Sequence, residues 1–486
     1  MHKSRVDFLL WVTRLTFEIS LPGTYNKGSS MHRRPNMTET AEKKSFFQTV
    51  CALAIPVALQ SMLQASFSIV DQIMIGQLGS VSIAGVGLAG KFSSVYSVIV
   101  SALGTVAGIM ISQYMGQENR REVKRSFTVN LLFMAALACV FTLLCALFPV
   151  QIMGLYSKDR ETVLSAAAYL SIISATFLPL AGATMLSSLF RCMEKAALPL
   201  YASIGAAVTN TALNYLLIFG KLGLPALGAE GAALATVVSQ AVNFAVMLLL
   251  MFKQRKLFAP ALKEKAGFSG FNWKQYAAML LPLLVCEFMW SLGENVYAVI
   301  YGHIGTDAMA AMTLINPVQG LMIGALCGLS QAAGILIGKL LGNGEYDSAY
   351  KAGKKLLLYG FAGSVFLSVL IVLASPFYVK IYRVDETVRH LTTQILLAYA
   401  LVAPFKVENM ILGGGVIRSG GRTEFVMAID LIGTWLFGVP LGLLSAFLFK
   451  LSIPWVYFIL SLEECVRFGL SLAVFKRKRW MRSLKA

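Results

Sequence analysis

The sequence contains little charge and no residue spacing typical of a metal site or a disulfide scaffold. Asp, Glu, Lys and Arg make up 14% of the 486 residues, whereas a soluble domain has about 25%. The seven cysteines and four histidines are scattered, and the cysteines lie in or beside apolar runs. There is also no paired catalytic histidine and no Ser–Lys motif. We therefore expect no enzymatic activity and no cofactor.

Apolar residues are abundant instead. They make up 57% of the chain, and the mean hydropathy is +0.69. This composition predicts an all-α polytopic membrane protein. The net charge of +18 would suggest a nucleic-acid partner in a soluble protein. In a membrane protein, lysines and arginines in the cytoplasmic loops account for a net positive charge. We therefore expect contact with membrane lipid and not with nucleic acid.

From Phe46 onward the hydropathy pattern predicts twelve transmembrane helices. Each apolar run is near or above the roughly 20 residues that a helix needs to cross a bilayer. The expected spans are 47–76, 82–114, 124–149, 162–190, 197–219, 228–252, 276–302, 308–341, 353–378, 390–417, 424–448 and 453–475.

The distribution of basic residues predicts the orientation in the membrane. Clusters of Lys and Arg follow the even-numbered spans, and the tail KRKRWMRSLK is basic too. The clusters include Arg120, Arg121, Lys124, Arg125, Arg191, Lys195, Lys253, Lys351, Lys354, Lys355, Arg418 and Arg422. Because basic loops stay on the cytoplasmic side, we expect both termini in the cytoplasm and the protein in the cell membrane.

The chain contains an internal repeat. The stretch Pro56–Gly79 has a counterpart at Pro282–Gly305, 226 residues later, and Gly108–Gly116 has one at Gly334–Gly342 at the same offset. Six spans per repeat is an even number, so both copies enter the membrane from the same side. This pattern predicts two six-helix lobes related by a pseudo-twofold axis, with a substrate site at the repeat interface.

These features divide the chain into five parts. The N-terminus is expected to be disordered or an over-long gene call, the two lobes are joined by a cytoplasmic linker, and a basic cytoplasmic tail follows. The predicted boundaries are 1–45, 46–255 for the N-lobe, 256–275 for the linker, 276–475 for the C-lobe and 476–486.

The first predicted helix carries an unexpected polar stripe. Its members fall within roughly 80° of one helix face, at about 100° per residue. They are Gln60, Gln64, Ser68 and Asp71. A polar stripe on a membrane helix faces a cavity or another helix, because lipid cannot satisfy it.

The equivalent helix of the second repeat carries a second stripe. It combines two carboxylates with aromatic rings and comprises Glu287, Trp290, Glu294, Tyr297 and Tyr301. Carboxylates beside aromatic rings suit organic cations, through charge and cation–π contact. We expect the two stripes to face the same place. The alternative is that these residues only join helices by hydrogen bonds.

Further polar residues lie inside other spans. Asn210 and Asn214 are one turn apart in the fifth span and could complete a polar site with Asp71. Lys406 and Glu408 lie in the tenth span, where a Lys–Glu pair could serve as a gate or only as a structural tie. We expect H⁺ or Na⁺ coupling at Asp71, Glu287 or Glu294, because a coupling group must change its charge between two conformations.

Several motifs together resemble the MATE family of multidrug and toxin extrusion transporters, bacterial type. They are SIVDQIMIGQLG, ISQYMGQENRREVKRS, LPLYASIGAAVTNTALNYLLIFG, LGAEGAALATVVSQ, GILIGKLLGNGEYDSAYKAGKK and GGGVIRSGGRTEF. The resemblance covers residues 45–475 and implies a two-lobed antiporter that expels organic cations or drugs in exchange for H⁺ or Na⁺. We expect it to act as a monomer.

The resemblance also assigns residues. The first-span aspartate of the family matches Asp71, and a fifth-span aspartate of some members is replaced here by Asn214. A seventh-span glutamate of the family falls at Trp290, with Glu287 and Glu294 one turn to either side. The tenth-span acidic residue has only Glu408 as a loose counterpart.

One alternative function stays open at this point. Lipid-linked oligosaccharide flippases belong to the same superfamily and tend to have a cationic cavity for pyrophosphate. Lys91 and Lys406, both inside predicted spans, keep that alternative open.

Overall fold

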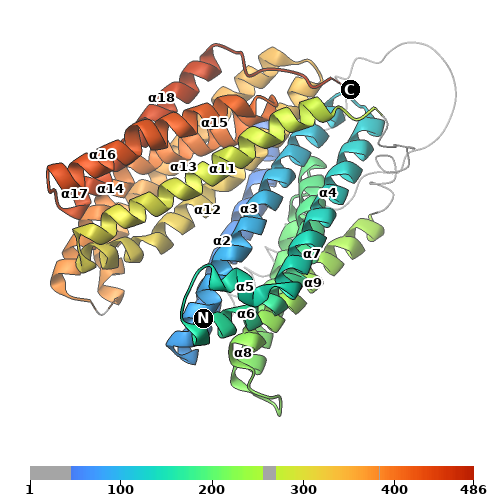
Figure 1. The fold of residues 1–486 in the computed structure, drawn as a ribbon. Helices are drawn as coiled ribbons and strands as arrows, with labels where there is room; N and C mark the ends of the chain where they lie inside the picture. The colour runs from blue at the N-terminus through green and yellow to red at the C-terminus, as the bar shows by residue number, and fades with distance from the viewer. Residues whose placement is uncertain (1–44, 255–269, 383, 486) are drawn as a thin grey trace, which may run out of the picture. The chain divides into compact units, whose positions relative to one another are not determined.

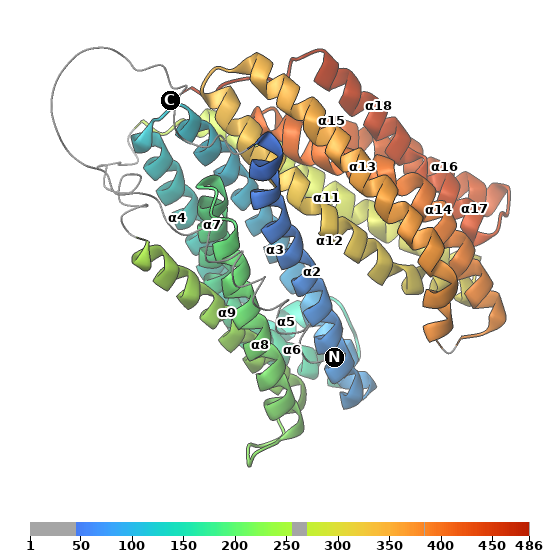
Figure 2. The same ribbon diagram turned by 180° about the vertical axis from the view of Figure 1, so that it is seen from behind.

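The computed structural model describes residues 45–254, 270–382 and 384–485. Within these ranges the regular structure is entirely helical, and no strand occurs. Figures 1 and 2 show two groups of helices, one coloured blue to green and the other yellow to red. The predicted N-terminal segment 1–45, apart from Ser45, and most of the predicted linker 256–275 lie outside the described residues.

The first group forms the N-lobe. Its helices are α2 (Phe46–Ile75), α3 (Ser80–Gly116), α4 (Arg120–Leu147), α5 (Pro149–Gly154), α6 (Arg160–Ile173), α7 (Phe177–Cys192), α8 (Ala197–Phe219) and α9 (Gly228–Lys253). A short 3₁₀ turn at Gly76–Leu78 follows α2, and another at Ser174–Thr176 joins α6 to α7. The predicted fourth span is therefore α6 and α7 in succession.

The second group forms the C-lobe. Its helices are α11 (Trp273–Ile304), α12 (Thr306–Gly342), α13 (Tyr346–Tyr378), α14 (Glu386–Ile411), α15 (Thr423–Leu431), α16 (Val439–Leu443), α17 (Ile453–Ser461) and α18 (Glu463–Lys476). A 3₁₀ turn extends α13 at Val379–Ile381. π-Helical segments extend α14 at Leu412–Ile417, α15 at Ile432–Gly438 and α16 at Leu444–Leu448.

These helices confirm the predicted fold class. In the described part of the chain, eleven helices are long and apolar enough to cross a membrane. The expected twelfth span, 453–475, is present as α17 and α18, which a turn at Leu462 separates. Each piece alone is shorter than the roughly 20 residues needed to span a bilayer, but together they reach that length.

The first helix of each lobe begins at a side-chain cap. Ser45 forms a capping box with Gln48 at the start of α2, and the Asn272 side chain accepts a hydrogen bond from the Gln275 backbone N–H at the start of α11. Such caps satisfy backbone donors that have no partner inside the helix. The turns that follow α2 and α11 contain Gly79 and Gly305 at φ values of +92° and +147°, which favour glycine.

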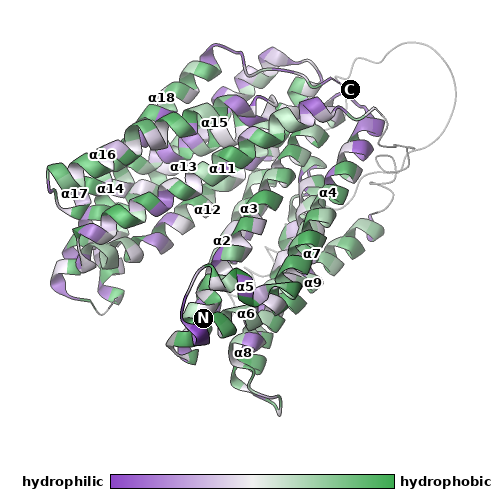
Figure 3. Cartoon of the chain, viewed as in Figure 1, coloured by the Kyte–Doolittle hydropathy of each residue, from purple (hydrophilic) through white to green (hydrophobic). Residues whose placement is uncertain are grey.

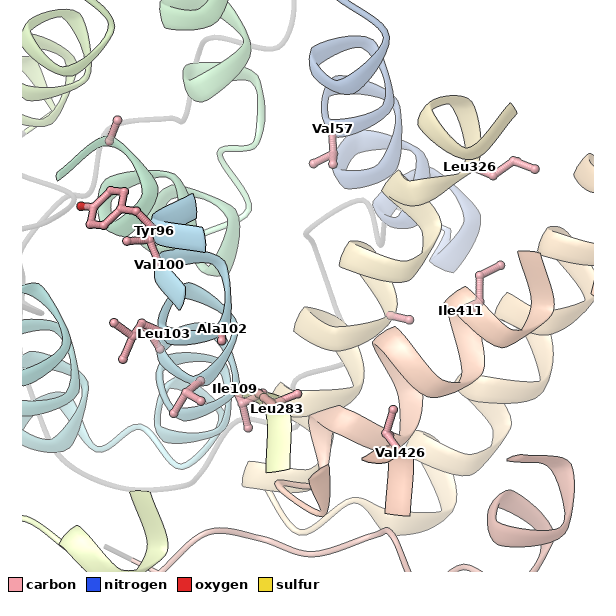
Figure 4. Packing of buried hydrophobic residues seen from close by; sticks show 14 of the residues in the cluster. Val57, Tyr96, Val100, Ala102, Leu103, Ile109, Leu283, Leu326, Ile411 and Val426 are labelled. Atoms are coloured by element: carbon pink, nitrogen blue, oxygen red, sulfur yellow. The ribbon is translucent and has the colours of Figure 1, made fainter. Parts of the chain in front are cut away.

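The outer surfaces of the lobes suit contact with lipid. Large apolar side chains are exposed there, for example Leu249 at 67% and Phe366 at 63%. Figure 3 shows helices that are hydrophobic along most of their length, with hydrophilic residues gathered mainly near their ends. Figure 4 shows buried apolar residues inside the protein, with Tyr96 and Val100 on one side of the view and Ile411 and Val426 on the other.

The lobes join through a reciprocal contact between α3 and α12. A Cβ added to Gly116 would collide with the carbonyl oxygen of Lys339, and a Cβ added to Gly342 would collide with the carbonyl oxygen of Gln113. Gly116 and Gly342 are equivalent in the repeat, as are Gln113 and Lys339. The contact is therefore pseudo-symmetric, and it depends on glycine at both positions.

The C-terminal tail reinforces this contact. Trp480 is fully buried, and its indole N–H donates to the Phe475 carbonyl at 3.2 Å. The Gln113 side chain donates to the Ser419 carbonyl at 2.6 Å and accepts from the Leu484 backbone N–H at 2.7 Å. One side chain of the N-lobe thus holds both a C-lobe loop and the tail.

The lobes separate away from this end. Gly324 of α12 packs against Met62 of α2, but a Cβ on Gly320, one turn away, would meet no atom within 4 Å. The closed end carries the basic loops, so the protein is closed at its basic end and open toward the other.

The reciprocal contact makes a stability prediction. Gly342→Ala should lower the free energy of unfolding by about 1–3 kcal/mol, because its Cβ overpacks the Gln113 carbonyl. Thermal unfolding in detergent measures the effect. Gly205→Ala in α8 is the control, since its Cβ would have no neighbour within 4 Å. Equal melting temperatures for the two variants would contradict the prediction.

Candidate functional site

The N-lobe contains a cavity of about 370 Å³ between α2, α8 and α9. Its lining includes three of the four residues of the first predicted stripe and also Asn210. The lining residues are Leu63, Gln64, Phe67, Ser68, Asp71, Ser203, Ala206, Ala207, Asn210, Thr236, Ser239, Gln240 and Asn243. None of them carries a positive charge.

A chain of polar contacts leads into this cavity from Asp71. The Asn214 amide donates to Asp71 Oδ1 at 2.5 Å and to Asn210 Oδ1 at 3.2 Å, and the Asn210 amide donates to Thr236 Oγ1 at 3.3 Å. Asn214 is buried at 1% exposure. The predicted association of Asp71 with the two fifth-span asparagines is therefore present in the structure.

Asp71 has no cationic partner. No Lys or Arg of the described residues lies within 4.0 Å of its carboxylate. The Asn214 Oδ1 atom is also buried without a hydrogen-bond partner among them. Carboxylate, amide and hydroxyl oxygens are the groups that hard cations prefer, so this arrangement can hold a proton or a small hard cation.

Gln60 lies outside the cavity. It is buried at 6% exposure, donates to Ser203 Oγ at 2.8 Å, and accepts from Arg191 Nη2 at 2.9 Å. These bonds join α2 to α7 and α8. The contacts of Gln60 are therefore hydrogen bonds that join helices, which was the alternative to a role in a substrate cavity.

The C-lobe contains two neighbouring cavities. The larger, of about 380 Å³, is lined by Glu287, Trp290 and Lys406 among others. The smaller, of about 230 Å³, is lined by Glu294, Tyr297 and again Lys406. The second stripe is thus divided between them, and Lys406 borders both.

Three members of the second stripe, Glu287, Glu294 and Tyr297, have distinct environments. The Glu287 carboxylate lies 3.8 Å from Arg418 Nη1, which gives it a partial counter-charge. Glu294 is exposed in the smaller cavity. Tyr297 is buried and donates its hydroxyl to Glu463 Oε2 at 2.5 Å.

Glu408 points away from both cavities. It is buried at 3% exposure, and its Oε1 would lie 2.8 Å from a Cβ at Gly360 of α13. Its neighbours Val407 and Asn409 line the larger cavity, but Glu408 does not. The expected Lys406–Glu408 pair is absent from the ion pairs of the described residues, because the two side chains lie on different faces of α14.

A charged cluster that was not predicted from the sequence lies on α18 and the neighbouring α15. Arg467 lies between three carboxylates, at 3.9 Å from Asp430, 4.0 Å from Glu463 and 3.8 Å from Glu464. Glu464 also accepts from the Asn409 amide at 2.9 Å. The signal was present in the sequence, because three charges inside a predicted span call for partners.

The two stripes do not share a cavity. α2 lines its cavity together with α8 and α9, whereas α11 lines its cavities together with α12, α14, α15 and α18, besides α17. The expectation that both stripes face one place at the repeat interface is therefore not met, because each lobe encloses its own polar face. Among the described residues no group of three or more His, Cys, Asp or Glu could hold a metal ion.

The chain is similar to a known protein family and to several of its members. The MatE family model matches the chain twice, at residues 56–216 and 282–444, and the two matches begin 226 residues apart. The "Uncharacterized transporter YisQ" of Bacillus subtilis is 22% identical over 452 residues, covering 91% of this chain and 97% of the relative. The "Probable multidrug resistance protein NorM" of Brucella suis is 25% identical over 484 residues, covering 96% of this chain and 98% of the relative.

Solved structures show the same fold. A MATE structure in complex with MaL6 superposes with a TM-score of 0.80 at 16% identity, covering 90% of this chain and 98% of that one. An outward-facing multidrug resistance MATE transporter superposes with a TM-score of 0.79 at 16% identity, covering 91% of this chain and 99% of that one. With the family model matching both repeats, the chain belongs to the MATE family of efflux transporters, as the motifs predicted.

Proposed function

We propose that the protein is a secondary antiporter of the cell membrane that exports organic cations, including drugs, in exchange for H⁺ or Na⁺. The observation that carries this proposal is the uncompensated Asp71 carboxylate, hydrogen-bonded to Asn214 in a cavity without basic residues. Asp71 is half-buried, and a carboxylate without a counter-charge inside a membrane span is costly and marks a functional site. Both the substrate and the coupling ion are cations, so they compete for the same charge.

The size and lining of the N-lobe cavity support an organic substrate. A volume of about 370 Å³ lies within the range of about 300–1,000 Å³ that small-molecule pockets occupy. Phe67 offers an aromatic surface beside Asp71. Binding of H⁺ or Na⁺ at Asp71 removes the charge that holds an organic cation, and this exclusion couples the two fluxes.

The arrangement of the lobes supports alternating access. The positive-inside rule assigns the basic, closed end to the cytoplasm, together with the C-terminal tail. On this assignment, the state in which the Gly116 and Gly342 contacts are formed is the outward-open one, with these contacts on the cytoplasmic side. Export requires these contacts to separate and the opposite ends of the lobes to close.

The N-lobe is the better candidate for coupling. Asp71 lacks a cationic partner, whereas Glu287 has Arg418 within 4.0 Å. Glu294 shares its cavity with Lys406. A group that already has a counter-charge gains less from binding a cation, so we place the principal coupling site at Asp71.

The flippase alternative finds less support. The N-lobe cavity has no lysine or arginine in its lining. In the larger C-lobe cavity, Lys406, Arg418 and Arg467 are matched by Glu287, Asp430 and Glu464. Neither cavity presents the excess positive charge that a pyrophosphate group requires.

Asp71→Asn should abolish ion-coupled efflux, lowering it at least about tenfold, because the exchanged cations lose their shared charge. The measurement is uptake of a fluorescent organic cation into proteoliposomes under an imposed pH gradient or an imposed Na⁺ gradient. Whichever gradient drives the wild-type protein identifies the coupling ion.

Glu424→Gln is the control for this experiment. It removes one carboxylate that pairs with Arg422 at 3.0 Å, remote from the cavity lining. We expect transport close to that of the wild type. Coupled transport retained by Asp71→Asn at the level of Glu424→Gln would refute the assignment of Asp71.

Asn214→Ala should weaken coupling without abolishing substrate binding, because it removes the donor to Asp71 and an amide oxygen but keeps the carboxylate. We expect the ion concentration for half-maximal transport to rise about tenfold, in line with the cost of losing a hydrogen bond to a charged group. Titration of transport against pH or Na⁺ measures it. An unchanged half-maximal concentration would show that Asn214 has only a packing role.

A further inference from the structure

A small cavity lies between the lobes and adjoins the larger C-lobe cavity, with which it shares Ser330, Gln331, Gly414 and Arg418. It measures about 80 Å³ and is bordered by α3 and α7 from the N-lobe and by α12 and the end of α14 from the C-lobe. Its lining residues are Gly104, Thr105, Gly108, Ile109, Ser188, Arg191, Cys192, Ser330, Gln331, Gly334, Ile335, Gly414, Gly415, Arg418 and Ser419.

The cavity lies on the pseudo-twofold axis. Four residues of α3 that line it have counterparts on α12 exactly one repeat later, for example Gly108 and Gly334. Arg191 and Arg418 form another such pair, offset by 227 residues. Each lobe therefore contributes one arginine to the same small space.

The two arginines are held in equivalent ways. Arg191 Nη2 donates to Gln60 Oε1 at 2.9 Å, and Arg418 Nη2 lies 3.9 Å from Cys286 Sγ. Gln60 and Cys286 are themselves separated by one repeat. The guanidinium positions thus follow the symmetry of the fold.

The positive charge at this place is not balanced. The described residues include no carboxylate within 4.0 Å of Arg191, and Arg418 has only Glu287, at 3.8 Å. The Nε atoms of both arginines are buried without a hydrogen-bond partner in the described part of the chain. Two cations in one interior cavity repel each other, and each unpaired donor adds a desolvation cost.

We propose that this cavity binds a small monovalent inorganic anion, such as chloride, between Arg191 and Arg418. The anion supplies the missing counter-charge and accepts the unpaired N–H groups. A volume of 80 Å³ suits an ion with a few waters and is far below the about 300–1,000 Å³ of a drug-sized pocket. The site is therefore too small for the organic substrates proposed above, although it borders the larger C-lobe cavity.

The anion acts on conformation, because the site exists only while the lobes meet. A ligand bound to one state stabilises that state by its binding free energy. The anion therefore favours the arrangement that is closed at the basic end. This consequence rests on the proposed alternation of the lobes, whereas the binding itself does not.

Binding of radioactive chloride to the purified full-length protein, in chloride-free gluconate buffer, tests the site directly. We expect saturable binding by the wild type and an affinity at least about tenfold lower for Arg191→Gln and for Arg418→Gln, each of which removes a charged donor. Lys339→Gln is the control and should bind as the wild type does. It breaks the 2.6 Å ion pair with Glu194 between the lobes but lies outside the cavity lining.

A second variant tests the site even if the arginine variants do not fold. The double substitution Gly108→Ala with Gly334→Ala keeps both arginines. Neither added Cβ would meet an atom closer than 3.8 Å, so the fold should be retained while the cavity becomes smaller. We expect weaker chloride binding by this variant.

Absence of chloride binding by the wild type would overturn the proposal, and so would equal affinity in the wild type, the folded arginine variants and the double alanine variant. These results are independent of transport, because binding is measured without a gradient. Failure of the antiport experiments with chloride binding intact would reject the proposed function and leave the anion site standing.

Discussion

The membrane requires every polar group to find a partner inside the protein, and this constraint explains most of the structure. Backbone groups are satisfied within helices, which is why no strand occurs in the described residues. Polar side chains follow the same rule: Gln60 joins three helices, and Arg467 lies among three carboxylates. Against this background, Asp71 and Arg191 belong to a small set of charges inside the spans, with Glu294, Lys406 and Glu408, that have no opposite charge within 4.0 Å in the described part of the chain. A cation bound at Asp71 or an anion bound at Arg191 would supply the opposite charge that the protein does not provide there.

The repeat gives the fold its symmetry, and the symmetry places the contacts between the lobes. Gly116 and Gly342 each approach the backbone of the opposite lobe, and Arg191 and Arg418 border one cavity on the axis. A pseudo-symmetric interface of this kind can separate by rotation of two similar bodies, which suits a transporter with two access states. The tail adds an asymmetric contact, since Leu484 binds both Gln113 and Gln117 of the N-lobe.

The lobes differ in the chemistry they enclose. The N-lobe cavity has one carboxylate supported by amides and a hydroxyl, whereas the larger C-lobe cavity balances three acidic with three basic residues. A balanced network is stabilised by its own ion pairs and gives little free energy to a passing cation. An isolated carboxylate gives much more. The asymmetry between two similar halves therefore favours coupling in the N-lobe.

Hydropathy and helix length in the sequence were enough to predict the fold class, the spans and the repeat, because they are local properties that a bilayer makes decisive. The sequence also identified Asp71, Asn210 and Asn214 as partners, since each was an uncommon polar residue in an apolar run. The cavities that polar residues share could be assigned only from the packing of the helices. This packing placed Gln60 and Glu408 outside the cavities, separated the two stripes, and brought Arg191 beside Arg418. These outcomes depend on the packing of helices far apart in the sequence, and the rotation of each helix about its axis is set by its neighbours.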